Sequence, residues 1–281
     1  MSTRLKRFVD GVRRVLSSPV FITIAQVQYG GILQGRRILV TGGTAGIGMA
    51  IARRCLQEGA EVLITGRSEA RLTEARELLS GPQGKRLCVQ RWDISDVRNL
   101  NSHLDTAVEL LGGLPDTLIN NAGVINTNPF PQVTEENWDI IYSTNSKGTY
   151  FLTQEFCRRW LQAPSAPVLK KVINISSQGA FVGATYPYRM SKWDLAGMTA
   201  GLGALMAGRG ILVNGIAPGI VRTNMQPQEM KQGKDSSCPH NQLRRHALPE
   251  EIAELAVFML SDACNFMVGH TVVCDGGYSL K

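Results

Sequence analysis

The sequence has no uninterrupted apolar stretch of about 18 residues, the length that a membrane-spanning helix needs. Its six cysteines form no Cys-x-x-Cys pair and show no Cys/His spacing typical of metal ligands, and most of them lie within apolar segments. Internal repeats and low-complexity segments are also missing. We therefore expect a globular protein without a transmembrane span or a metal site, in a reducing, cytoplasmic location.

Acidic residues are fewer than basic residues, with 23 Asp and Glu against 30 Lys and Arg, and the formal net charge is +7. The basic residues are scattered along the chain in short doublets such as Arg13-Arg14 and Arg244-Arg245. This pattern argues against a nucleic-acid partner, whereas a mildly basic surface suits an anionic cofactor.

The first 34 residues differ from the rest, because basic residues accompany apolar residues at helical spacing. The apolar positions are Leu5, Phe8, Val9, Val12 and Leu16. We expect this N-terminal extension (residues 1–34) to form an amphipathic helix that docks on its own domain or on a sister subunit. A membrane-surface anchor and a cleaved targeting peptide are the less favoured alternatives.

Residues 35–281 alternate between short runs rich in Val, Ile and Leu and longer segments with helical periodicity. The runs cover residues 36–42, 61–66, 86–94, 116–123, 170–177, 211–219 and 271–277. Strands that alternate with helices and are apolar on both sides are typical of a parallel sheet buried between two helical layers. We predict an α/β fold, with a single doubly wound, Rossmann-type parallel sheet and helices on both faces.

A glycine-rich turn joins the first predicted strand to an amphipathic helix, with glycines at positions 42, 43, 46 and 48. Glycine permits a tight turn and a close backbone approach to a pyrophosphate, and the positive end of the following helix favours the anion. A plain structural turn is the alternative. The strand before and the helix after give these glycines the context of a dinucleotide site.

The second predicted strand ends in Gly66 and Arg67, where many dinucleotide folds have a carboxylate for the ribose hydroxyl of NAD. Without that carboxylate a 2′-phosphate is not repelled, and a guanidinium binds such a phosphate bidentately. This favours NADP(H), with NAD(H) as the second choice, unless Arg67 is only a solvated strand-end residue. Asp93 closes the third strand, where it either meets the adenine amino group or caps a helix.

Seven signatures follow one another in residues 35–280. They are T-G-x-x-x-G-I-G at 41–48, N-N-A-G at 120–123, Asn145 in a long helix, Ser177 after a strand, Y-x-x-x-K at 188–192, A-P-G at 217–219 and D-G-G at 275–277. In this combination the chain resembles the short-chain dehydrogenase/reductase family in its single-domain form, especially the 3-oxoacyl-carrier-protein reductase-like members. The resemblance implies a sheet of about seven strands in the order 3-2-1-4-5-6-7.

Tyr188 and Lys192 are four residues apart, so a helix places them on the same face. A free phenol has a pKa near ~10, and an ammonium about 4 Å away contributes up to ~4 kcal/mol of gross Coulomb energy. We therefore expect Lys192 to bring the pKa of Tyr188 toward working pH.

The resemblance also implies a role for each residue of the catalytic set. Tyr188 exchanges a proton with the substrate oxygen, and Lys192 also binds the nicotinamide ribose. Ser177 orients the substrate oxygen and Asn145 supports a water relay, although a strand cap and a helix-interior polar residue are the alternatives for these two. The implied cofactor-binding residues are Gly42, Thr44, Ala45, Gly46, Ile47, Gly48, Arg67, Ser68, Asp93, Ile94, Asn121, Ala122, Gly123, Tyr188, Lys192, Pro218, Gly219, Val221 and Thr223.

The predicted function is NADPH-dependent hydride transfer between nicotinamide and a small carbonyl or alcohol substrate, including 3-oxoacyl compounds. A non-catalytic dinucleotide-binding regulator or scaffold with the same fold is the alternative. Helices at about 135–160 and 188–208 resemble the pair that family members bury between subunits, which implies a homo-oligomer, a tetramer or a dimer. The interval from Ser177 to Tyr188 is about two residues shorter than the common family spacing, so the substrate cannot be copied from a relative.

The longest segment without a clear period covers residues 223–247, and its polar composition predicts a lid or substrate loop. Its charged residues are Lys231, Lys234, Arg244 and Arg245 against Glu229 and Asp235. One hypothesis is that this loop receives an anionic substrate or carrier group. The other is a solvated polar lid over a neutral ketone or polyol.

Overall fold

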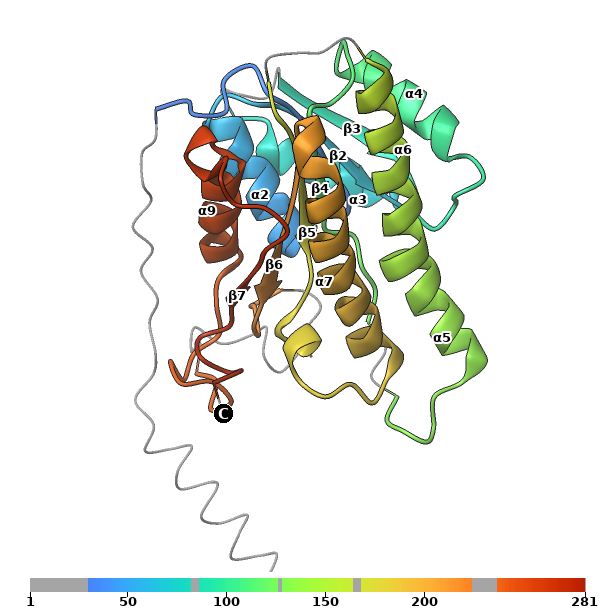
Figure 1. The fold of residues 1–281 in the computed structure, drawn as a ribbon, viewed down its shortest axis with the longest axis vertical. Helices are drawn as coiled ribbons and strands as arrows, with labels where there is room; N and C mark the ends of the chain where they lie inside the picture. The colour runs from blue at the N-terminus through green and yellow to red at the C-terminus, as the bar shows by residue number, and fades with distance from the viewer. Residues whose placement is uncertain (1–29, 82–85, 126–127, 164–167, 224–236, 281) are drawn as a thin grey trace, which may run out of the picture.

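The computed structural model describes residues 30–81, 86–125, 128–163, 168–223 and 237–280. Their centre is a seven-stranded parallel sheet (Figure 1). The strands are β1 (Arg37–Val40), β2 (Glu61–Gly66), β3 (Leu87–Arg91), β4 (Thr117–Asn120), β5 (Lys170–Ile175), β6 (Ile211–Pro218) and β7 (Thr271–Cys274). Their order is β3-β2-β1-β4-β5-β6-β7, which confirms the predicted fold class and strand order.

The strands are buried on both faces, as their apolar runs predict. All four positions of β4 and all eight positions of β6 are buried. Ile38 of β1 is in register with Val62 on one side and with Thr117 on the other, so β1 lies between two parallel neighbours. A strand in this position needs apolar side chains on both faces, because each face is covered by helices.

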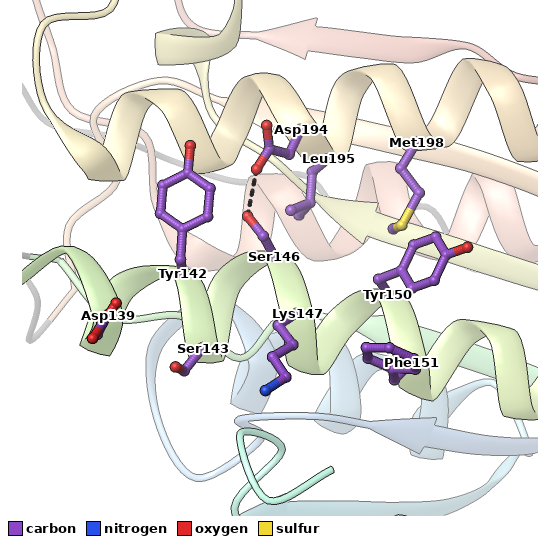
Figure 2. A pocket seen from close by; sticks show the side chains of 10 residues that line it. All are labelled: Asp139, Tyr142, Ser143, Ser146, Lys147, Tyr150, Phe151, Asp194, Leu195 and Met198. Carbon is purple, nitrogen blue, oxygen red and sulfur yellow. Dashed lines mark hydrogen bonds between the residues drawn. The ribbon is translucent and has the colours of Figure 1, made fainter.

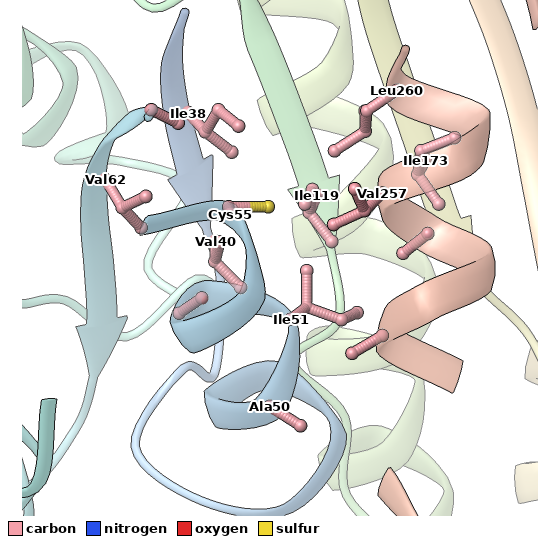
Figure 3. Close-up of a cluster of buried hydrophobic side chains, with 14 of the residues drawn as sticks. Ile38, Val40, Ala50, Ile51, Cys55, Val62, Ile119, Ile173, Val257 and Leu260 are labelled. Atoms are coloured by element: carbon pink, nitrogen blue, oxygen red, sulfur yellow. The ribbon is translucent and has the colours of Figure 1, made fainter. Parts of the chain in front are cut away.

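Helices form a layer on each side of the sheet (Figure 1). The first layer contains α2 (Gly46–Gln57), α3 (Glu69–Leu79) and α9 (Pro249–Leu260), and the second contains α4 (Leu100–Leu110), α6 (Thr149–Gln162) and α7 (Pro187–Met206). Figure 3 shows part of the first layer, where Ile51 and Cys55 of α2 and Val257 and Leu260 of α9 pack beside strand residues such as Ile119. Each fully buried aliphatic side chain of this kind contributes ~1.5–3 kcal/mol.

The long helix expected at about 135–160 is divided into three parts. The helix α5 (Glu135–Tyr142) leads into a π-helical turn, η2 (Ser143–Gly148), which continues directly into α6. Gly148, the last residue of this turn, packs against the loop that follows β3. A Cβ at this position would lie only 2.3 Å from the carbonyl oxygen of Ile94. A π turn inside a helix often marks a functional position, and this one contains Asn145.

The start of the described chain is attached to the domain. The Glu58 side chain accepts hydrogen bonds from the backbone amides of Gly31 and Ile32, at 2.9 and 3.2 Å, and Leu33 is buried in the core. Residues 1–29 of the predicted N-terminal extension lie outside the described residues. No described helix combines the length and the apolar composition that crossing a membrane would require.

Candidate active site

The turn after β1 is too crowded for a side chain at Gly42, Gly43 or Gly48. Gly42 has φ +64°, and a Cβ there would lie 2.8 Å from the Cα of Ala122. A Cβ at Gly48 would lie 2.5 Å from the carbonyl oxygen of Gly42. The helix α2 begins at Gly46 with no acidic residue in its first turn, so its free amides and positive end suit a pyrophosphate. These residues therefore fit the dinucleotide that the sequence predicts.

The loop after β4 is tied directly to the glycine turn. The hydroxyl of Thr41 accepts 3.0 Å hydrogen bonds from the amides of Asn121 and Ala122. The side-chain amide of Asn121 in turn donates to the carbonyl oxygens of Thr41 and Gly42, both at 3.0 Å. Asn121 therefore fixes the backbone conformation of the glycine turn through its side chain. The motif alone does not predict this structural role.

The predicted adenosine residues lie at the ends of β2 and β3. Arg67 is exposed, and Ser68 is the N-cap of α3, where its hydroxyl accepts a 3.4 Å hydrogen bond from the amide of Arg71. Asp93 accepts hydrogen bonds from both the amide and the hydroxyl of Ser95, at 3.0 and 2.8 Å. These bonds cap a local turn and not a helix, because the next helix, α4, begins only at Leu100.

One charged residue at this end of the sheet was not predicted from the sequence. Arg91 ends β3, is exposed, and donates a 3.2 Å hydrogen bond from Nε to the carbonyl oxygen of Arg67. Arginine at a strand end is a common surface feature, so the sequence carries little signal for it. Arg91 could have been recognised only from the register of β2 and β3, which pairs it with Gly66.

The helix α7 carries the Tyr-x-x-x-Lys pair at its start, with Pro187 in its first turn. The ammonium of Lys192 lies 5.6 Å from the centroid of the Tyr188 ring and donates a 2.9 Å hydrogen bond to the carbonyl oxygen of Ile175. A Cβ on Gly123 would lie 3.7 Å from the same ammonium. Lys192 therefore lies buried between the ends of β4 and β5, beside the predicted nicotinamide cleft.

The pKa values of the pair move in a direction that the sequence did not predict. Burial raises the pKa of Tyr188 to about 12, although hydrogen bonding to the Ser177 side chain opposes the rise. Burial also lowers the pKa of Lys192 to about 8. The expectation that Lys192 brings the pKa of Tyr188 toward neutrality is wrong for this geometry, because desolvation of the phenolate outweighs the distant ammonium. At neutral pH Tyr188 keeps its proton and can act as a donor.

The two serines after β5 have different partners. Ser176 donates a 2.8 Å hydrogen bond to the carbonyl oxygen of Lys192 and thereby fixes α7 against the sheet. Ser177 accepts a 3.1 Å hydrogen bond from the amide of Gly179 and also bonds to the Tyr188 side chain. The predicted residue, Ser177, is therefore the one whose hydroxyl reaches the tyrosine, and it caps a short 3-10 turn as well.

Asn145 is almost completely buried, and the protein uses all of its side-chain polar groups. Its Oδ1 accepts a 2.9 Å hydrogen bond from the amide of Val124, and its Nδ2 donates to the carbonyl oxygen of Val124 and to the hydroxyl of Ser191, both at 3.0 Å. These bonds join the loop after β4 to α7. The side chain thus positions the two elements that flank the cleft.

An aromatic and cationic stack adjoins Tyr188. The rings of Tyr186 and Tyr188 are nearly parallel, with centroids 6.5 Å apart, and the guanidinium of Arg189 lies 5.4 Å from the centroid of Tyr186. Arg189 also donates a 3.1 Å hydrogen bond to the carbonyl oxygen of Gly183. The shortened loop before α7 is therefore held close to the tyrosine by residues of α7 itself.

The loop after β6 closes the other side of the glycine turn. A Cβ on Gly46 would lie 3.1 Å from the methyl group of Thr223. Gly219 packs against Asp275 and donates a 2.9 Å hydrogen bond to the carbonyl oxygen of Cys274, and Val221 forms a bridge with Ala247. The predicted residues from Pro218 to Thr223 thus lie where β6 meets the turn.

The predicted substrate loop is only partly described, and Lys231 and Lys234 lie outside the described residues. Arg245 forms a bidentate ion pair with Glu251 of α9, with both distances 2.7 Å, and this pairing raises the pKa of the guanidinium. Arg244 is exposed and has φ 53°. The charge of Arg245 is therefore already neutralised by the protein, which removes it from the set of cations expected to receive an anionic substrate.

Known proteins are similar to this chain over most of its length. The family model described as enoyl-(acyl carrier protein) reductase matches residues 42–279. The 3-oxoacyl-acyl-carrier-protein reductase of Aquifex aeolicus is 31% identical over 250 residues, which cover 87% of this chain and 98% of the relative. L-2,3-butanediol dehydrogenase of Corynebacterium glutamicum is 32% identical over 256 residues, which cover 85% of this chain and 96% of the relative.

A solved structure agrees with these relatives. The crystal structure of a short-chain dehydrogenase from Burkholderia cenocepacia J2315 in complex with NADP has a TM-score of 0.77 and 29% identity, and the match covers 88% of this chain and 98% of that chain. The chain belongs to the short-chain dehydrogenase/reductase family. It is an NAD(P)-dependent oxidoreductase that acts on CH–OH groups.

Proposed function

We propose that the protein is an NADPH-dependent carbonyl reductase in which Tyr188 is the proton donor. The observation that carries this proposal is the meeting of Ser177, Tyr188 and Lys192 beside the glycine turn, with the tyrosine hydrogen-bonded to the serine. The substrate is a ketone, or a secondary alcohol in the reverse direction. Likeness to the Aquifex aeolicus enzyme makes 3-oxoacyl compounds one candidate class.

Each residue of the set has a defined task in this reaction. A nicotinamide cofactor, when bound, would supply the hydride for the carbonyl carbon. Tyr188 donates its proton to the carbonyl oxygen, and Ser177 donates a hydrogen bond to the same oxygen as negative charge develops there. Lys192 is charged below its pKa of about 8, and its ammonium at the end of β5 lies where it would bind the nicotinamide ribose. Asn145 acts through Val124 and Ser191, which it holds in place.

The cofactor contacts follow the carboxyl edge of the sheet. The pyrophosphate is held by the amides of the turn that begins α2, and the adenosine by residues at the ends of β2 and β3. The proposed contacts are Gly42, Thr44, Ala45, Gly46, Ile47, Gly48, Arg67, Ser68, Asp93, Ile94, Asn121, Ala122, Gly123, Tyr188, Lys192, Pro218, Gly219, Val221 and Thr223. NADP(H) is preferred because Gly66 places no carboxylate near the 2′-phosphate and Arg67 offers a cation.

A second copy of the chain covers the outer faces of α5, α6 and α7. These faces expose Trp138, Ile140, Tyr150, Phe151, Trp193 and Leu205. A groove of about 540 Å³ between these helices is lined by residues that include Tyr150, Phe151, Met198 and Lys147. Figure 2 shows these side chains and the hydrogen bond between Ser146 and Asp194. Apolar residues beside charges of both signs suit a self-complementary, two-fold interface. A dimer or a tetramer results.

Sedimentation at micromolar concentration tests the assembly. We expect the mass of a dimer or a tetramer for the wild type and a lower mass for a Tyr150→Ser, Phe151→Ser variant. Leu78→Ser, which removes an exposed leucine from α3 on the other helical layer, serves as the matched control. A monomeric wild type would contradict the assembly without affecting the proposed reaction.

A reducing, cytoplasmic location accompanies this function. All six cysteines are free thiols, and burial raises the pKa of several of them, including Cys55 and Cys157. Thiols of this kind behave as small apolar groups of the core.

The decisive experiment measures NADPH oxidation against a panel of ketones while the NADPH dissociation constant is determined in parallel. Turnover of one or more ketones together with tight NADPH binding supports the reductase. Tight binding without turnover on any ketone or on the matching alcohols with NADP would instead indicate a dinucleotide-binding regulator. Absence of binding would contradict both.

A further inference from the structure

Gly66 and Arg91 are partners in the register of β2 and β3. The same register row contains the pairs Val62 with Leu87 and Ile64 with Val89, and these four side chains belong to the core beneath α2 and α3. Paired positions in neighbouring parallel strands point to the same face of the sheet, and side chains alternate between faces along each strand. Arg91 therefore leaves the sheet on the side of α2, which is the side of the glycine turn.

Gly66 has no side chain, so it does not fill the space beside Arg91. A Cβ at position 66 would lie 2.7 Å from the Cγ2 atom of Thr44, so the position faces the glycine turn directly. In dinucleotide folds this strand end carries the residue that meets the 2′ position of the adenosine ribose. Because residue 66 has no side chain, Arg91 is the side chain that the paired position of β3 provides on the same face.

The guanidinium of Arg91 contacts the end of β2. Its Nε donates a 3.2 Å hydrogen bond to the carbonyl oxygen of Arg67, which brings it to the residue that follows Gly66. Both arginines are exposed, so a ligand reaches them from solvent. Among the residues that the structure describes, neither guanidinium lies within 4.0 Å of a carboxylate.

We infer that Arg91 and Arg67 together bind the 2′-phosphate of NADP(H), and that Arg91 is a specificity-determining residue of the cofactor site. This inference rests on the NADPH preference proposed above. Arg91 bonds to the backbone carbonyl of Arg67, so the two cationic residues are neighbours, and a phosphate dianion can accept charge-assisted hydrogen bonds from both. The adenosine of NADH has no group that could do so.

The test compares NADPH and NADH binding to the full chain without substrate, so that its result is independent of turnover. For Arg91→Gln we expect the NADPH dissociation constant to rise by roughly 10- to 100-fold and that of NADH to change by less than about threefold. Arg67→Gln should behave similarly. Arg209→Gln removes an exposed arginine that precedes the amino end of β6, a strand that is not adjacent to β2 or β3, and should leave both constants unchanged.

Two smaller ligands distinguish the contribution of the 2′-phosphate to affinity from that of the adenine base. Adenosine 2′,5′-bisphosphate should lose affinity for Arg91→Gln, and adenosine 5′-monophosphate should not. Arg91→Lys retains the charge without the planar fork, so it should recover part of the lost affinity. Thermal unfolding of each variant verifies that the fold is intact.

Each alternative result has a distinct meaning. Equal weakening of NADPH and NADH by Arg91→Gln would overturn the inference, because it would indicate stacking of the guanidinium on adenine. An unchanged NADPH preference in this variant would overturn the role of Arg91 while leaving the preference itself intact. Equal wild-type affinity for both cofactors would overturn the proposed preference and the inference together.

Discussion

Lys192 and Tyr188 are neighbours on one face of α7, with the ammonium 5.6 Å from the centroid of the phenol ring. The ammonium bonds to the carbonyl oxygen of Ile175, which keeps the lysine at the strand end where a ribose would lie. Burial moves the pKa of the tyrosine up and that of the lysine down, to about 12 and about 8. The tyrosine is therefore protonated at neutral pH, and the lysine is the group of the pair whose pKa is nearer to neutral pH.

Removal of the tyrosine hydroxyl should abolish catalysis and spare cofactor binding. For Tyr188→Phe we expect a loss of turnover of at least ~10²-fold, because the transferable proton is gone while the ring still fills its site. The NADPH dissociation constant, measured by fluorescence, should change by less than about threefold. Tyr150→Phe removes the hydroxyl of an exposed tyrosine on α6 and is the control. Turnover of Tyr188→Phe within a few-fold of wild type would contradict the assignment.

The lysine should set the alkaline limit of ketone reduction. Lys192 loses its charge as pH rises through about 8, so kcat/KM for reduction should fall above this pH. Lys192→Met should lower the rate by at least ~10-fold, weaken NADPH binding, and abolish this titration. A pH profile of the variant that keeps the wild-type alkaline limb would show that another group is responsible.

Cofactor preference should follow the charges at the end of β2. Gly66→Asp with Arg67→Leu should shift the preference from NADP(H) toward NAD(H), because a carboxylate repels the 2′-phosphate. A Cβ at position 66 would lie 2.7 Å from the Thr44 methyl group, so Thr44→Ser should be added to make room. The ratio of kcat/KM for the two cofactors measures the shift. Equal wild-type efficiency with both would contradict the premise.

Arg244 and Arg245 of the substrate loop should have different roles, one in substrate binding and the other in stability. Arg245 is paired with Glu251, whose carboxylate also accepts a hydrogen bond from the amide of Leu248 at the start of α9. Arg245→Ala should therefore lower the free energy of unfolding by ~1–3 kcal/mol, as measured by urea denaturation. Arg244→Ala should leave stability unchanged and lower efficiency on anionic ketones more than on matched neutral ones. Equal losses on both substrates would exclude an anion-receiving role for Arg244.

A buried lysine remote from the site should make stability depend on pH. Lys171 of β5 donates a 2.6 Å hydrogen bond to the carbonyl oxygen of Ser261, and burial lowers its pKa to about 8. The unfolded chain has the higher pKa, so it binds the proton more tightly, and stability rises with pH between about 8 and 10.5.

Lys171→Met should remove this dependence. From pH 7 to pH 10 the free energy of unfolding of the wild type, relative to that of the variant, should increase by about 3 kcal/mol. Urea denaturation at both pH values measures the change. A difference that is constant with pH would indicate that the lysine titrates alike in the folded and unfolded chains.

The strands and their order could be predicted from the sequence, whereas the roles assigned to the site residues stay a prediction. Each of the seven observed strands lies within its predicted run, because an apolar run of four to eight residues between turn residues has few other stable conformations in a parallel sheet. The parallel topology then brings the loops after β1, β4, β5 and β6 to one edge. Tyr188 and Lys192 share a face by helical spacing alone.

Four features were decided only by tertiary structure. Desolvation sets the pKa of Tyr188, and the surroundings that bury it come from segments far apart in the chain. The π turn at Asn145 forms where the side chain bonds to Val124 and where Gly148 meets the carbonyl of Ile94. The pairing of Gly66 with Arg91 depends on the register of two strands, and that of Arg245 with Glu251 on the packing of a loop against α9. Local sequence encodes propensity and periodicity, whereas distances between remote residues and the loss of water around them arise only when the chain has packed.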